Sequence, residues 1–159
     1  MTELNPIQKL SVDFTPKRIV LCPVDASKQT PKVLDWAKKY FFNTESDLVI
    51  LLYVYQSANS SFASFTTKEM IQKAEHDITQ GATRLMREYI TVIQNGNLHV
   101  EGYITHGDPR TVITEQISNL KANCVLMGRR GLGPIKSSFM GSVSNHVLHT
   151  SEVPVLVIP

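Results

Sequence analysis

The sequence predicts an α/β domain built on an open, five-stranded parallel sheet with helices on both faces. Short apolar runs rich in Val, Ile and Leu alternate with longer segments of helical periodicity. This alternation continues through five strands, which is the order of a parallel sheet with helical crossovers. No internal repeat interrupts it and no second domain is apparent. Numbered along the chain, the five strands are expected in the spatial order 3-2-1-4-5.

Length and composition exclude several classes of protein. The 159 residues are 42% apolar and 19% charged, so the chain can bury a core and is not disordered throughout. A net charge of only +2 argues against a large basic surface for duplex DNA. No apolar run reaches the roughly 18 residues of a membrane span, and the first residues do not resemble a signal peptide. We therefore expect one cytoplasmic domain that binds neither membranes nor nucleic acid.

The first half of the predicted domain begins at Lys17, after an extension over residues 1–16 that carries two prolines. Residues 18–24 form a nearly continuous apolar run, typical of a strand that is buried on both faces. The next helix is expected to use Thr30 as its N-cap and Pro31 as its first helical residue. Residues 48–55 repeat the pattern of a buried strand.

The middle of the chain contains a polar stretch and the longest helix. Residues 56–67 have no regular period and are predicted to form a mobile loop. Apolar residues then step by three and four from Lys68 to Gln94, and Gly96 suits a left-handed cap after that helix. Residues 98–104 alternate as a more exposed strand does, and Gly107-Asp-Pro109 marks the start of another helix.

The last segments are a short strand, a glycine-rich loop, a helix and a final strand. Residues 124–127 are the strand, residues 128–141 the loop, residues 142–149 the helix and residues 153–158 the last strand. Cys22 and Cys124 both lie within apolar strands that are expected to be neighbours, so packing explains them better than a disulfide.

The predicted strand order locates a ligand site. In open α/β sheets, ligands bind beyond the carboxyl ends of the strands, where the strand order reverses. Here that position lies between the first and fourth strands, whose ends are Pro23-Val24-Asp25 and Met127-Gly128.

The loop after the fourth strand has the composition of a phosphate site. Its glycines allow backbone N–H groups to approach an oxygen-rich ligand, and Gly141-Ser142-Val143 begins a helix whose free amides favour an anion. From Gly128 to Ser151 there are three basic side chains and no acidic one. The spacing fits neither a Walker loop nor a dinucleotide fingerprint. A flexible surface turn is the alternative interpretation, as a simple N-cap is for Ser142 and a turn residue for Asp25.

The spacing Gly128-x-x-Gly131, nine residues, Gly141-Ser142 resembles the nucleotide-binding signature of the universal stress protein family. The resemblance covers residues 17–159. It extends to Val24-Asp25-x-Ser27 after the first strand, to Gly107-x-Pro109 after the third, and to the closing strand.

This resemblance implies a Rossmann-like fold of the adenine nucleotide alpha hydrolase type that binds ATP. Asp25 and the backbone at Val54 would then hold the adenosine end, and Gly128 would contact the ribose. The remaining implied contacts are a pocket wall from Pro23 and Val24, a contact at Met127, and a phosphate cradle from Gly131, Gly141, Ser142 and Val143. Mg²⁺ or Mn²⁺ often accompanies the phosphates in the family.

The resemblance also implies a homodimer that pairs its last strands, over residues 153–158, since an uncovered apolar edge strand invites pairing. Arg129 and Arg130 either contact phosphate or face solvent. The leading hypothesis is an ATP-binding regulatory protein of the stress response, acting on a protein partner that the sequence does not name. The alternatives are a slow ATP hydrolase or phosphotransferase, and a dimeric interaction module in which nucleotide is incidental. No catalytic residue is assigned.

Overall fold

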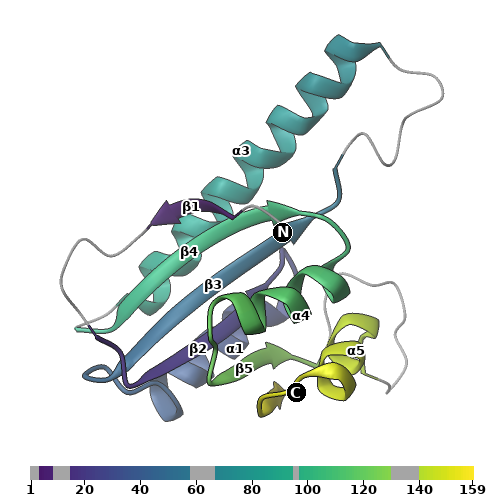
Figure 1. The fold of residues 1–159 in the computed structure, drawn as a ribbon. Helices are drawn as coiled ribbons and strands as arrows, with labels where there is room; N and C mark the ends of the chain where they lie inside the picture. The colour runs from purple at the N-terminus through teal and green to yellow at the C-terminus, as the bar shows by residue number, and fades with distance from the viewer. Residues whose placement is uncertain (1–3, 9–14, 58–66, 95–96, 130–139) are drawn as a thin grey trace.

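A computed structural model describes residues 4–8, 15–57, 67–94, 97–129 and 140–159 of the chain (Figure 1). The loop predicted over residues 56–67 and the cap predicted at Gly96 fall mostly or wholly outside these residues.

One mixed sheet of six strands forms the centre of the molecule, in the spatial order β1-β4-β3-β2-β5-β6. The prediction of five strands in the order 3-2-1-4-5 is therefore wrong in the strand count, because β1 adds an antiparallel strand beside β4. The five strands that follow β1 are parallel and have the neighbours expected for them. The strands are β1 (Asn5–Gln8), β2 (Arg18–Val24), β3 (Asp47–Tyr55), β4 (His99–His106), β5 (Cys124–Gly128) and β6 (Val155–Ile158).

Strand β1 belongs to the segment that the sequence predicted as an extension. Its pairing with β4 shifts register between Pro6 and Gln8, and the Gln8 side chain donates a hydrogen bond from Nε2 to the Val100 carbonyl at 3.0 Å. Local sequence does not predict this strand, because it has only four residues and includes a proline. Proline is tolerated there because an edge strand leaves one row of N–H groups unpaired.

In the described residues, four helices cover the two faces of the sheet: α1 (Gln29–Tyr40), α3 (Lys68–Ile93), α4 (Pro109–Asn119) and α5 (Ser142–Thr150). Figure 1 shows α4 and α5 on the near face and α1 and α3 behind the sheet. Two of the helices begin with side-chain caps. The Thr67 hydroxyl accepts from the Met70 amide at 3.4 Å, and the Asp108 carboxylate accepts from the Arg110 amide at 2.8 Å.

The start of α1 differs from the prediction. Lys28 is the N-cap, without a side-chain hydrogen bond, and Thr30 lies inside the first turn. The Thr30 hydroxyl is instead bound to Asp25. A threonine hydroxyl can bind either a helix amide or a nearby carboxylate. Here it binds the carboxylate, so the sequence pattern that predicts an N-cap marks a different contact. The last strand also begins at Val155 rather than Val153.

Each face of the sheet has its own apolar core. Val20, Val49 and Met86 belong to the core beneath α1 and α3, whereas Leu52 and Ile113 belong to the core beneath α4 and α5. The strands contribute alternate residues to the two layers, as expected for a sheet covered on both sides.

The two cysteines, Cys22 and Cys124, are free, and they lie on the adjacent strands β2 and β5 as predicted. Burial raises the pKa of both thiols, so they remain protonated packing groups at neutral pH.

An ion pair fixes the end of the sheet opposite the predicted site. Arg18 Nε donates to Asp47 Oδ1 at 2.9 Å, and the Asn43 amide donates to Asp47 Oδ2 at 2.7 Å. Asp47 is only 1% exposed. Because Arg18 and Asp47 are also register partners, the pair ties β2 to β3 where both strands begin.

Candidate functional site

The strand order reverses between β2 and β5, and we call the region beyond the carboxyl ends of these two strands the crevice. Strand β2 pairs with β3 over seven residues but with β5 at only two positions, Val20 with Cys124 and Leu21 with Val125. Beyond these pairs, the described parts of β2 and β5 share no further ladder position. The ends of the two strands therefore separate where the strand order reverses, which is the geometry that a ligand site needs.

Asp25 follows β2 at this crevice and is held in place from several sides. Its Oδ1 accepts from the Ser27 amide at 3.1 Å and from the Thr30 hydroxyl at 2.8 Å. The Asp25 amide donates to Thr30 Oγ1 at 3.2 Å, and the Tyr89 hydroxyl donates to the Asp25 carbonyl at 2.9 Å. Helices α1 and α3 thus fix both the side chain and the backbone of a half-buried carboxylate.

Two tyrosines surround Asp25 that sequence reasoning did not assign to the site. Burial raises the pKa of Tyr53 and of Tyr89, and the nearby Asp25 carboxylate raises both further. Both phenols therefore stay neutral at physiological pH, and the Tyr89 hydroxyl is a donor to the Asp25 carbonyl. Tyr89 falls at an apolar position of the α3 period, so the sequence indicates only a core residue. The one signal for its contact with Asp25 is its hydroxyl, because a buried tyrosine hydroxyl needs a hydrogen-bond partner.

On the other side of the crevice, α5 is anchored to the end of β5. The Gly141 amide donates to the Arg129 carbonyl at 2.8 Å, and the Ser144 hydroxyl donates to the Gly128 carbonyl at 2.7 Å. The Arg129 amide donates to the Ile158 carbonyl at 2.7 Å and so continues the β5–β6 pairing. Ser144 is buried and was not predicted as a site residue. These bonds direct the start of α5 at the crevice.

The first turn of α5 presents backbone amides to an anion. Gly141 is the N-cap, so Ser142 is the first helical residue rather than the cap. The Asn145 amide makes the first helical bond, to the Gly141 carbonyl at 2.9 Å. The amides of Ser142, Val143 and Ser144 precede it and have no carbonyl within the helix to bind. This turn holds no acidic residue, and the helix dipole adds positive potential.

The predicted site residues at the strand ends differ in what they offer a ligand. Val24 and Met127 have buried side chains, so a ligand would reach chiefly their main chain. Pro23, Val54 and Gly128 are half-buried and remain accessible at the ends of β2, β3 and β5.

Arg129 is half-buried at the start of the loop. Arg130 and Gly131 lie outside the described residues, so their predicted phosphate contacts stay predictions.

The chemistry of the crevice fits a phosphate better than a bare cation. Backbone amides bind anions, and the part of the chain that the structure describes contains no cluster of three metal-ligating side chains.

A separate hollow of about 910 Å³ lies along the outer face of α3, where His76, Gly81 and Arg84 are among the lining residues. One helix supplies all of its described lining, and that face points away from the core. We do not assign this hollow to the phosphate ligand.

Among the described helices, α3 included, none is both long and apolar enough to cross a bilayer.

The fold is that of an α/β protein whose parallel strands reverse their order between β2 and β5. The sequence pattern of the universal stress protein family matches residues 17–159, and the chain belongs to that family.

Relatives of known name and structure agree with this assignment. Universal stress protein YxiE from Bacillus subtilis is 25% identical over 146 residues, covering 87% of this chain and 97% of the relative. The solved structure of hypothetical protein MJ0577 has a TM-score of 0.77 at 24% identity, covering 91% of this chain and 96% of that one.

Two further structures of similar fold contain nucleotides. A family protein from Arabidopsis thaliana with AMP bound has a TM-score of 0.64 at 20% identity, covering 89% of this chain and 90% of that one. A universal stress protein from Archaeoglobus fulgidus in complex with dAMP has a TM-score of 0.62 at 17% identity, covering 91% of this chain and all of that one. At these identities the likeness shows the fold.

Proposed function

We propose that this protein binds an adenine nucleotide, with ATP as its physiological ligand, in the crevice between β2 and β5. The observation that carries the proposal is the first turn of α5, whose amides are held at the end of β5 by two short hydrogen bonds. A phosphate chain is the ligand that such a turn favours. The AMP and dAMP complexes of similar folds support adenine as the base.

The nucleotide would lie across the crevice from β3 to α5. The Asp25 carboxylate and the Val54 backbone would hold the adenosine end, and Gly128 would contact the ribose. The amides of Ser142 and Val143 would bind the phosphates, and Gly141 would leave room for them. Mg²⁺ or Mn²⁺ would neutralise charge on the triphosphate. Because Asp25 is already fixed by Thr30, Ser27 and Tyr89, little ordering would be needed on binding.

The site suits a regulatory role better than efficient phosphoryl transfer. Phosphoryl transfer needs carboxylates that hold metal, a positioned nucleophile and groups that stabilise charge. Asp25 is the only carboxylate among the residues that we assign to the crevice, and it lies at the adenosine end. We therefore expect ATP to act as a signal in the stress response, by stabilising one conformation for a protein partner.

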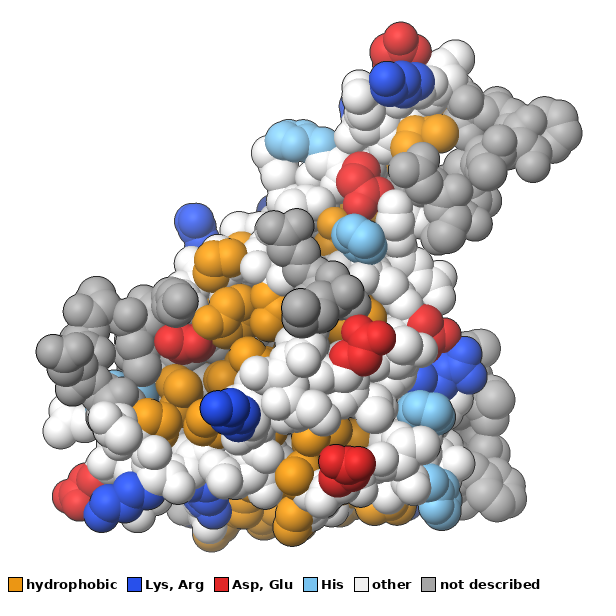
Figure 2. Space-filling model, in the orientation of Figure 1, with side chains coloured by type: hydrophobic (Ala, Val, Ile, Leu, Met, Phe, Trp, Pro, Cys, Tyr) orange, Lys and Arg blue, Asp and Glu red, His pale blue; other side chains and the backbone are white. Residues whose placement is uncertain are grey.

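The two edges of the sheet support a homodimer formed through β6. Strand β1 protects its edge with Pro6 and a break in register, two features that discourage pairing. Strand β6 has neither, and its residues Val155, Leu156 and Val157 remain half-exposed. Figure 2 shows hydrophobic side chains at the lower edge of the molecule, where β6 lies. Pairing of two β6 strands would bury these side chains.

The proposal is tested by ligand recovery. Purified protein is incubated with ATP and Mg²⁺, separated from free nucleotide, and its bound ligand is identified by chromatography over time. We expect about one ATP per chain that remains ATP. Accumulating ADP would favour the slow hydrolase, and the absence of bound nucleotide would favour the interaction module.

A matched pair of variants shows whether the α5 turn binds the phosphates. Gly141 has φ −63° and ψ 151°, which any residue adopts, so Gly141→Val disturbs the site rather than the backbone. We expect it to weaken ATP binding at least tenfold and AMP binding less. Ser118→Val is the control, since Ser118 is exposed in the last turn of α4, at the end of the sheet opposite the crevice. Equal affinities for both variants would contradict the proposed phosphate position.

A further inference from the structure

Helix α3 has an outer face that the nucleotide proposal does not use. The N-terminal half of the helix projects beyond the sheet (Figure 1). Residues spaced by three and four along it share one side of the helix, which we call the α3 seam. Its members are Met70, Lys73, Asp77, Gln80, Gly81, Arg84, Glu88 and Val92. We propose that the α3 seam binds the α3 seam of a second copy of this chain, with the two helices antiparallel.

The charges of the seam are complementary to themselves. Helix α3 runs from Lys68 to Ile93, and its midpoint falls between Gln80 and Gly81. When two copies are related by a two-fold axis at this midpoint, residues equally distant from it face one another. Lys73 then faces the partner's Glu88, and Asp77 faces the partner's Arg84. Symmetry repeats both contacts, so four attractive pairs form and no like charges oppose one another.

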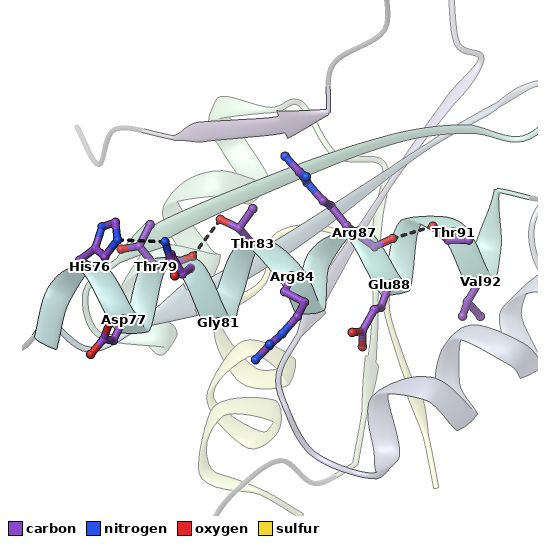
Figure 3. Close-up of a pocket in the computed structure, with 11 residues that line it drawn as sticks. His76, Asp77, Thr79, Gly81, Thr83, Arg84, Arg87, Glu88, Thr91 and Val92 are labelled. Carbon is purple, nitrogen blue, oxygen red and sulfur yellow. Dashed lines mark hydrogen bonds between the residues drawn. The ribbon is translucent and has the colours of Figure 1, made fainter. Parts of the chain in front are cut away.

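The same charges are not paired with each other within the helix. Lys73 with Asp77, and Arg84 with Glu88, have the spacing of intrahelical ion pairs. However, the ion pairs recorded for the described residues are Arg18–Asp47 and Arg110–Asp108, and neither involves the seam. Figure 3 shows Asp77, Arg84 and Glu88 projecting from the same side of α3. These charges therefore remain available to a partner.

The ends of the seam add apolar contacts in the same arrangement. Met70 is 58% exposed and Val92 is 40% exposed, which is unusual for large apolar side chains. They lie at opposite ends of the seam, one turn or less from the two helix ends. An antiparallel pair places Met70 beside the partner's Val92 at each end. The antiparallel arrangement thus pairs the charges and also buries the exposed apolar residues.

Gly81 at the centre suits a close helix crossing. Glycine weakens a helix interior, so its presence there requires a reason. The chain itself supplies none, because a Cβ at Gly81 would meet nothing within 4 Å. The outer face of α3 around Gly81 forms the open hollow described above. A glycine at the axis would let the backbone of a partner helix approach closely.

The partner helix would run along the whole of α3 and would meet Lys38 of α1 at its C-terminal end, where Lys38 Nζ donates to the Val92 carbonyl at 2.8 Å. The two helices would overlap along their whole length of roughly 39 Å, at 1.5 Å per residue. Each projecting N-terminal half would lie against the C-terminal half of the other α3. Because the charges of the seam are complementary about its midpoint, a second copy of this chain is the partner that matches all of them at once. The interface shares no residue with β6, so using both would produce a tetramer or an open chain.

Charge-reversal mixing tests the proposal. In Lys73→Glu alone, or Glu88→Lys alone, two attractive pairs become repulsive, and we expect self-association through α3 to weaken at least about tenfold. An equimolar mixture of the two variants restores attraction at both positions and forms a 1:1 complex. Sedimentation velocity at low salt measures this, with mass spectrometry of the native complex to identify its composition. A mixture that associates no better than either variant alone would overturn the proposal, and a folding defect could not produce the rescue.

Cross-linking fixes the position of the axis. Gln80→Cys places two thiols beside the proposed axis, whereas two cysteines in Gln72→Cys would lie about 25 Å apart along the paired helices. A short bis-maleimide should link the first variant and not the second, with the unmodified chain as background for Cys22 and Cys124. Linking at Gln72 but not Gln80 would contradict the antiparallel arrangement. Gly81→Ala provides a further readout, because it should raise the thermal stability of the chain while weakening the association.

Discussion

Thr30→Val should both destabilise the protein and weaken its hold on adenine nucleotides. Valine keeps the branched shape of threonine but removes the hydroxyl that binds the Asp25 carboxylate at 2.8 Å and the Asp25 amide at 3.2 Å. Thr30 is only 7% exposed, so water does not readily replace the hydroxyl. The perturbation therefore acts directly on the position of Asp25.

The magnitude follows from the two bonds. A hydrogen bond to a charged group contributes about 1.5–3 kcal/mol and one between neutral groups about 0.5–1.5 kcal/mol. Asp25 keeps its bond from the Ser27 amide, so the loss lies at the lower end of the sum of these two ranges. We expect a loss of about 2 kcal/mol in the free energy of unfolding. For a chain of this size, that lowers Tm by roughly 4–8 °C.

Two assays check this prediction together. Denaturant unfolding gives the change in stability, and isothermal titration calorimetry gives the affinity for AMP and ATP, each expected to fall about tenfold. Thr30→Ser is the matched control, because it keeps the hydroxyl and should retain most of the affinity. Unfolding free energies equal within about 0.5 kcal/mol for Thr30→Val and the unmodified protein would refute the reasoning.

Three further changes test other parts of the structure. Arg110 lowers the pKa of Asp108 from 3.8 to about 2, so this carboxylate contributes stability above pH 4 that is lost as the pH falls towards 2. Because Asp108 is 42% exposed, solvent reduces its contribution to the free energy of unfolding to about 0.5–1 kcal/mol. Asp108→Asn keeps the helix cap and should remove this pH dependence, measured by acid unfolding. Gly102→Ala should cost about 1–3 kcal/mol in denaturant unfolding, because its Cβ would lie 2.7 Å from Ile90 Cδ1; an unchanged midpoint would mean that this side chain shifts freely. Asp47→Ala removes the buried partner of Arg18 and should lower the unfolding free energy by about 2–4 kcal/mol, and a loss below 1 kcal/mol would show that Arg18 simply turns to solvent.

The sequence predicts most of the fold, because the relevant signals are local. The apolar runs at β2, β3 and β5 are buried strands, and the three-and-four spacing from Lys68 predicts α3 to within one residue. The start of α4 is confirmed, since Asp108 caps the helix and Pro109 begins it. Such signals depend on neighbours within a few residues, so one sequence is enough to reveal them.

The candidate site was predicted from the same kind of signal, and its supporting residues were not. The ends of β2 and β5 do separate at the predicted position, and α5 begins there. The contacts that hold Asp25 were missed, since Tyr89 lies 64 residues away in the chain and looks like an ordinary core position. Thr30 was assigned to the wrong partner, because a hydroxyl can bind either a helix amide or a carboxylate.

By itself, the sequence determined the alternation of strands and helices, the crevice where the strand order reverses, and the glycine pattern that resembles a nucleotide site. Tertiary structure alone decided that Asn5–Gln8 becomes a sixth strand, because its pairing depends on β4, which lies about 90 residues further along the chain. It also decided how Asp25 is held and that the charged face of α3 is left exposed. Periodicity is encoded within a few residues, whereas pairing partners are chosen by contacts that only the folded chain brings together.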